Sequence, residues 1–174
     1  MATMQANLAL ARTDDEIRLL FSALASPRDV ADLLEVRYGH MTAILYGPPR
    51  YREYATFEVR KRSGAPRVIS APPSGLKILQ SKLNHVFQLV YPRKRPVHGF
   101  VRDRSIVSNA RPHANKLWVL NVDLEDFFPT IHFGRVRGML ETTPYSLPRR
   151  VANVLAEICC ESTPRLLPQG APSS

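Results

Sequence analysis

The hydrophobic period of this chain changes at about residue 72, and this change limits the folds that it can adopt. Residues 54–60 alternate well enough for a β-strand, and residues 67–70 suit a partner strand across a turn at 63–65. After Pro72 and Pro73 the apolar residues recur at the spacing of one helix face. These positions are Leu76, Leu79, Leu83, Val86, Phe87 and Val90. The sequence therefore predicts an α/β (α+β) fold in which a β-hairpin leads into a long amphipathic helix.

Further helices are predicted on both sides of this unit. Thr13, followed by three acids and an apolar stripe, indicates a helix start, because threonine and a glutamate three residues later can form a capping box. Pro27 interrupts this helix, and a second one is predicted from Val30 to about Tyr38. Nearer the C-terminus, helices are predicted after Pro129 and over residues 148–160.

An apolar run of strand length, Leu117 to Val122, ends at Asp123. A carboxylate at the end of a buried strand is unfavourable for stability but well placed for a metal site. Polymerases use such an aspartate to hold two magnesium ions, which activate a primer hydroxyl and neutralise the leaving pyrophosphate. The alternative is an acid that caps the helix after Pro129, and Asp126 in particular suits that role.

The charge of the chain narrows the choice of partner. A net charge of +9 and a pI near 10.1 favour a polyanion, either nucleic acid or an anionic membrane surface. No apolar stretch approaches the roughly 20 residues of a membrane span, and the N-terminus has no signal-peptide pattern. Cys159 and Cys160 have no companions at metal-binding spacing, so we expect reduced, buried thiols in a cytoplasmic protein. These features favour nucleic acid over a membrane.

Several motifs between about residue 30 and the C-terminus resemble those of retron-type bacterial reverse transcriptases in order and spacing. They are Lys61-Arg62-Ser63-Gly64 with Arg67-Val68-Ile69, Leu76-Lys77 with Gln80, His98-Gly99-Phe100 with Arg104-Ser105-Ile106, Asn109-Ala110 with His113, Asp123 to Phe128, and Leu167 to Ser173. The resemblance implies an N-terminal helical region at 1–48, the fingers at 49–117, and the start of an incomplete polymerase palm at 118–174.

The resemblance also implies roles for single residues near the metal and the nucleotide. Asp123 is similar to the first catalytic, metal-binding aspartate of the family, and the backbone carbonyl of Leu124 to a further ligand of Mg²⁺, with Mn²⁺ as an alternative. Phe128 resembles the bulky gate beneath the sugar that disfavours a 2′-hydroxyl. Its alternative role is that of an ordinary core phenylalanine.

Other matched positions imply contacts with the nucleotide or the nucleic acid. Lys61 and Arg67 resemble the residues that grip the triphosphate, although a solvated basic hairpin is the alternative. Gln169 and Gly170 resemble the loop beside the nucleotide and template base, where glycine permits a close backbone approach; a simple turn is the alternative. The basic residues suited to the phosphates of a template–primer duplex, unless they form only a solvated face, are Arg93, Lys94, Arg95, Arg102, Arg104 and Arg111. For His98 and His113 we expect structural hydrogen bonds.

The activity implied by the resemblance is RNA-directed DNA synthesis. The implied partners are a structured noncoding RNA, an RNA–DNA duplex, deoxynucleoside triphosphates and an effector protein, in antiphage defence. The family places a Tyr-x-Asp-Asp hairpin and a thumb after the Gln-Gly motif, and this chain stops first, so we expect a truncated chain that is inactive alone. The alternatives are a group II intron or diversity-generating reverse transcriptase, a nonenzymatic RNA-binding remnant, and a scaffold subunit for a separately encoded palm.

Overall fold

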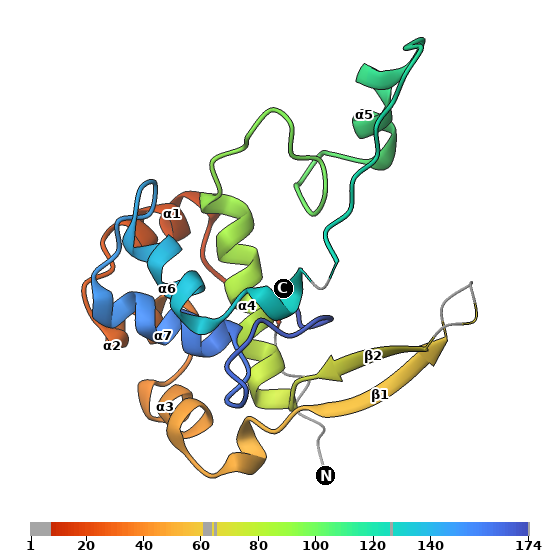
Figure 1. The fold of residues 1–174 in the computed structure, drawn as a ribbon. Helices are drawn as coiled ribbons and strands as arrows, with labels where there is room; N and C mark the ends of the chain where they lie inside the picture. The colour runs from red at the N-terminus through yellow and green to blue at the C-terminus, as the bar shows by residue number, and fades with distance from the viewer. Residues whose placement is uncertain (1–7, 61–63, 65, 126, 174) are drawn as a thin grey trace.

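Seven α-helices and one antiparallel β-hairpin make up the part of the chain that the structure describes (Figure 1). The structure is a computed structural model, and it describes residues 8–60, 64, 66–125 and 127–173, apart from the side chains of Arg67 and Val68. Most helices pack into one body, while the hairpin and a long arm that carries α5 project from it. The predicted mixed α/β fold is confirmed.

The first helix, α1 (Asp14–Ser22), begins as the sequence predicts. The backbone N–H of Glu16 donates to Thr13 Oγ1, and the Glu16 carboxylate accepts from the backbone N–H of Thr13 at 2.8 Å. This capping box satisfies N–H groups that have no partner within the helix. Ile17 and Phe21 lie on the inner face of α1 and are buried in the core.

The helix predicted from Val30 to about Tyr38 is present, but its bounds are wrong, because one helix ends at Leu33 and another begins at Tyr38. Helix α2 (Pro27–Leu33) starts at the proline, which suits a first helical position since its missing N–H needs no partner there. Helix α3 (Tyr38–Tyr46) follows a turn in which Glu35 has a φ of 51°. The Glu35 carboxylate accepts from the backbone N–H groups of Ala11 and Arg12, so the turn is tied to the segment before α1.

The predicted hairpin and the helix after it are both confirmed. A short 3₁₀ turn, η1 (Pro49–Tyr51), leads to β1 (Ala55–Arg60), which pairs with β2 (Pro66–Ala71) so that Phe57 faces Ile69 across the ladder. Gly64 lies between the strands with a φ of 84°, a conformation that glycine adopts without strain. Helix α4 (Ser74–Val90) then crosses the body. Four residues of its predicted apolar stripe are buried, and Phe87 and Val90 are partly buried against the same core.

Two helices that pack against each other complete the body, α6 (Phe133–Glu141) and α7 (Arg149–Cys159), and a 3₁₀ turn, η3 (Phe128–Thr130), precedes them. One cluster of buried apolar side chains joins α1, α2, α3, α4, α6 and α7, so all three predicted regions contribute to one core. Cys159 and Cys160 are buried free thiols, as predicted, and burial raises their pKa values to about 12 and 11.

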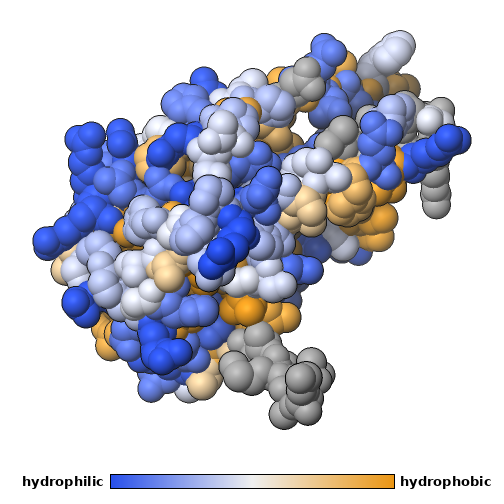
Figure 2. Space-filling view, turned by 90° about the horizontal axis from the view of Figure 1, so that it is seen from below, coloured by the Kyte–Doolittle hydropathy of each residue, from blue (hydrophilic) through white to orange (hydrophobic). Residues whose placement is uncertain are grey.

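The strand predicted at Leu117 to Val122 is wrong. These residues belong to the arm, which runs from about residue 92 through α5 (Ile106–Ala110) and η2 (Arg111–His113) back to η3. Leu117 is 95% exposed, Trp118 91% and Leu120 87%. A strand needs a neighbour for its backbone N–H and C=O groups, and none of the described segments pairs with this one. In the view from below, hydrophilic residues cover most of the left of the molecule, and the larger hydrophobic areas lie toward the right (Figure 2).

Trp118 offers a direct test of this exposed segment, because it is the only tryptophan in the chain. A ring that is 91% exposed should emit like free tryptophan in water and be quenched freely by acrylamide and iodide. We therefore expect red-shifted emission and efficient quenching in the folded 174-residue chain. Blue-shifted emission that resists iodide would contradict the exposed arm and favour the buried strand that the sequence predicts.

Candidate functional site

Asp123, the predicted metal ligand, lies exposed on the arm, a few residues before the arm rejoins the body. Its Oδ1 accepts from the backbone N–H of Leu124 at 3.0 Å. Within the described ranges, no group of three His, Cys, Asp or Glu side chains is placed to hold a metal ion. The role of Asp123 and of the Leu124 carbonyl as metal ligands stays a prediction.

Phe128 marks the point where the arm meets the body. It is half-buried in η3, and its ring meets that of Phe127 edge to face, with centroids 6.1 Å apart. Phe127 in turn lines an apolar cavity of about 390 Å³ together with Phe87, Met139 and Leu167. Phe128 is therefore partly shielded by aromatic packing, and its contact with a sugar stays a prediction.

The predicted Gln169–Gly170 loop lies beside the hairpin. The backbone N–H of Ser70 in β2 donates to the carbonyl of Gln169 at 3.4 Å. Gly170 has a φ of 101°, and a Cβ there would lie 3.2 Å from Ile69 Cγ2. Gly170 thus lies close to β2, and the predicted approach of Gln169 and Gly170 to the nucleotide stays a prediction.

A short antiparallel pairing brings this loop next to the segment that follows Phe128. His132 and Leu166 form an isolated β-bridge, and the N–H of Leu167 donates to the carbonyl of Ile131 at 2.8 Å. The structure therefore gathers β2, the Gln169–Gly170 loop and the chain after η3 at one side of the body. Lys61 lies outside the described residues, as does the side chain of Arg67, whose backbone pairs with Val59 in the ladder.

A buried polar network at the base of the hairpin was not predicted. Arg52 pairs with Glu157 of α7 at 2.9 Å, and both side chains are nearly buried, at 11% and 12% exposure. Gln80 of α4 is fully buried and donates to the Tyr54 hydroxyl at 2.7 Å and to the Ile158 carbonyl at 2.9 Å. The sequence offered one signal of this network: Gln80 lies within the apolar stripe of α4, and a buried amide needs hydrogen-bond partners.

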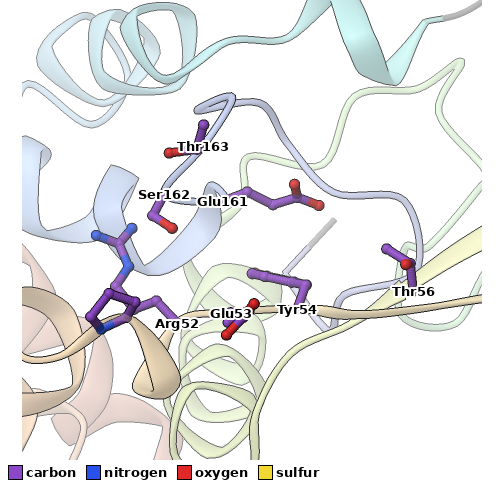
Figure 3. A pocket seen from close by; sticks show the side chains of 8 residues that line it. Arg52, Glu53, Tyr54, Thr56, Glu161, Ser162 and Thr163 are labelled. Carbon is purple, nitrogen blue, oxygen red and sulfur yellow. The ribbon is translucent and has the colours of Figure 1, made fainter.

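A cavity of about 380 Å³ opens beside this network (Figure 3). All but one of its lining residues are of polar type, and they come from the base of the hairpin and the loop after α7: Pro49, Arg52, Glu53, Tyr54, Thr56, Glu161, Ser162 and Thr163. Burial raises the pKa of Glu161, against the effect of a hydrogen bond from Ser70. Burial also raises the pKa of Tyr54. The cavity therefore lies between the hairpin base and the loop after α7, next to the place where Arg52 and Gln80 join the hairpin base to α7.

The first part of the arm, up to Lys116, carries most of the net positive charge of the chain. Residues 91–116 carry seven lysines and arginines and one aspartate, which supplies +6 of the total of +9. Arg93 pairs with Asp103 at 3.2 Å, and Arg102 pairs with Asp14 at 3.6 Å. Among the residues that the structure describes, the other predicted phosphate ligands form no ion pair: Lys94, Arg95, Arg104 and Arg111. This surface suits a polyanion.

The structural hydrogen bond expected for His98 is confirmed, since its two ring nitrogens lie 2.9 Å from Ser108 Oγ and 3.2 Å from Arg104 Nη1. His113 is exposed in η2, and its side chain has no hydrogen bond to the described part of the chain. No described helix has both the length and the apolar character needed to cross a membrane.

No protein-family model matches this chain. It is similar, however, to several proteins that are named retron reverse transcriptases. Retron Mx65 reverse transcriptase of Myxococcus xanthus is 39% identical over 164 residues, covering 84% of this chain and 38% of that protein. Retron Ec86 reverse transcriptase of Escherichia coli is 39% identical over 126 residues, covering 72% and 38%. Retron Mx162 reverse transcriptase of Myxococcus xanthus is 36% identical, covering 70% and 28%. The chain thus spans well under half the length of these curated relatives.

Proposed function

By sequence this chain belongs to the retron-type reverse transcriptases. We propose that it forms an N-terminal helical region (1–48), the fingers (49–117) and the opening part of the palm (118–174) of an RNA-directed DNA polymerase. Similarity over 84% of the chain to a protein of that name is the observation that carries the proposal. The proposed template is a structured RNA, and the proposed substrates are deoxynucleoside triphosphates. The basic arm supports the nucleic-acid partner, because its charge would attract the phosphate backbone.

The family implies magnesium, and the residues present fit it in chemical kind. Asp123 offers a solvent-facing carboxylate whose only hydrogen bond among the described residues comes from its neighbour's N–H, and Leu124 offers a backbone carbonyl. Both are hard oxygen donors of the type that Mg²⁺ prefers. When bound, the metal would stabilise charge on the reacting phosphate. Asp123 would supply the negative charge that binds the metal ion.

The proposal is tested by two measurements on the same protein. The reverse transcriptase that contains this sequence should incorporate labelled deoxynucleotides on a stem-loop RNA, and should bind that RNA with an affinity that falls as salt rises. Each phosphate contact contributes about 0.7–0.9 to the slope of log K against log salt. RNA binding without templated synthesis would instead support a nonenzymatic RNA-binding role, which the basic arm by itself also favours.

Lys94 and Arg111 allow a sharper prediction, because neither forms an ion pair in the described part of the chain. Replacing both with alanine should weaken RNA binding and reduce the salt slope by about 1.5, as expected for two lost phosphate contacts. Replacing Arg28 with alanine is the matched control, since this exposed arginine on α2 lies over the Tyr38 ring, far from the arm. Equal losses in both variants would show that the arm is not the binding surface.

Phe128 should determine which sugar is accepted if it lies beneath the incoming nucleotide. Replacing it with valine should open space for a 2′-hydroxyl, so the efficiency of ribonucleotide relative to deoxynucleotide incorporation should rise about tenfold, equivalent to about 1.4 kcal/mol. The ratio is measured in single-nucleotide extension by the reverse transcriptase. If Phe128 serves only in packing against Phe127, both efficiencies and the thermal stability should fall together and leave the ratio unchanged.

A further inference from the structure

The first half of the arm is ordered by a small polar cluster. Most side chains from residue 92 to 116 are exposed, but His98, Arg104 and Ser108 are partly shielded and contact one another. Ser108 also belongs to the capping box of α5, in which its Oγ accepts from the N–H of Ser105 at 2.9 Å and donates to the Ser105 carbonyl at 2.8 Å. The histidine therefore links the start of α5 to an arginine.

The partners of His98 determine where its proton lies. A guanidinium can only donate, so His98 Nε2, 3.2 Å from Arg104 Nη1, must accept. The ring is then neutral and carries its proton on Nδ1, which donates to Ser108 Oγ at 2.9 Å. This assignment satisfies Ser108 fully, because a hydroxyl has one hydrogen and two lone pairs, and Ser105 uses the hydrogen and one lone pair.

Arg104 is held by neutral groups, unlike two of its neighbours. Its Nη1 donates to the carbonyl of Arg95 at 2.9 Å and to His98. Arg93 and Arg102 are instead paired with carboxylates, those of Asp103 and Asp14. Arg104 thus keeps its full positive charge in a fixed position. Its Nε and Nη2 groups, which form one fork, have no partner among the described residues.

We propose that His98 is a positioning residue that presents the Nε–Nη2 fork of Arg104 to a phosphate of bound RNA. Such a fork matches two phosphate oxygens at once. Fixing the side chain beforehand avoids the loss of rotamer freedom that a mobile arginine would suffer on binding. The inference rests on the proposed nucleic-acid function and assigns to one histidine a share of the RNA affinity.

Three substitutions at His98 separate its two contacts, with binding of a labelled stem-loop RNA measured for the 174-residue chain. His98→Gln keeps an acceptor at the position of Nε2 and should retain affinity close to that of the unsubstituted chain. His98→Asn keeps only a donor near the position of Nδ1, and His98→Ala keeps neither. Both should weaken binding about three- to tenfold, as expected for one side chain that must be ordered on binding.

Repeating these substitutions in an Arg104→Ala background decides between positioning and a purely structural role. If His98 acts through Arg104, its substitutions should have no further effect once Arg104 is gone. Equal losses in both backgrounds, or a His98→Gln variant as weak as His98→Ala, would overturn the inference. RNA binding that no His98 variant changes would overturn it while leaving the proposed function standing. Absence of RNA binding in the unsubstituted chain would overturn the inference, whereas the proposed function fails only if the reverse transcriptase that contains this sequence neither binds RNA nor copies it.

The tautomer gives a second readout that needs no RNA. Nitrogen-15 NMR of the labelled imidazole should show His98 protonated at Nδ1 and unprotonated at Nε2 in the folded chain at neutral pH. Arg104→Ala should release this preference, because the donor that faces Nε2 is removed. A proton on Nε2 in the unsubstituted chain would overturn the inference directly, since that nitrogen could not then accept from Arg104.

Discussion

Replacing Asp123 with asparagine in the reverse transcriptase that contains this sequence is expected to reduce DNA synthesis by about a thousandfold or more. The substitution preserves size and removes the charge that the proposed metal ions need, and each factor of ten in rate corresponds to about 1.4 kcal/mol. Asp123 is exposed, so its loss should not disturb the core. The measurement is single-turnover primer extension on a structured RNA, with RNA binding followed in parallel.

Glu125 provides the matched control, because it is an exposed carboxylate two residues away on the same segment. Glu125→Gln should leave synthesis within a few-fold of the unsubstituted enzyme and RNA binding unchanged. If Asp123→Asn retains more than a few per cent of the activity, or if it is no weaker than Glu125→Gln, the catalytic carboxylate lies elsewhere. A parallel collapse of RNA binding would point to a structural effect instead.

Replacing Glu157 with glutamine is expected to destabilise the 174-residue chain by about 3–5 kcal/mol, a large part of the roughly 5–15 kcal/mol by which such domains are stable. Arg52 and Glu157 are about nine-tenths buried, so removing one charge leaves the other without its counter-ion in a poorly hydrated site. Arg52 would keep its backbone carbonyl partners, among them that of Leu45, but would have only neutral acceptors. Urea denaturation at neutral pH measures the loss.

Arg165 supplies the comparison for this prediction, because its guanidinium also contacts Glu157 but is half exposed. It lies over the Phe133 ring at 4.0 Å. Arg165→Ala should cost about 1 kcal/mol, as exposed ion pairs and cation–π contacts usually do. If Glu157→Gln costs no more than Arg165→Ala, the buried pair does not join the hairpin base to α7 in the way that its geometry indicates.

Local sequence patterns were sufficient where a segment makes its main contacts with itself or with its neighbours in the chain. The capping box at Thr13 set the start of α1, and the apolar stripes set α4 and α7 almost to the residue. The alternation around Phe57 and Ile69 gave the hairpin and its pairing. The boundary near Pro27 was misjudged because proline both ends helices and starts them, and only the surroundings decide which.

The candidate site depended far more on contacts between distant segments. The sequence identified Phe128 and Gly170 by motif, but only the fold places the Gly170 loop against β2 and beside the chain that follows η3. The motif likewise marked His98 without a role, and its role follows from Ser108 and Arg104. Spacing along a chain does not encode which polar groups meet when a loop folds back on itself.

Two places in the chain show most clearly what the sequence alone could not predict. By itself, the sequence determined the family, the α/β class, and the helices and hairpin that local periodicity specifies. Only the tertiary structure decided that the apolar run from Leu117 to Val122 lies exposed, and that Arg52 and Glu157 meet in the interior. The physical reason is common to both. A strand exists only through the hydrogen bonds of a partner strand, and a buried charge is tolerated only beside its counter-ion; in each case the deciding group is remote in sequence.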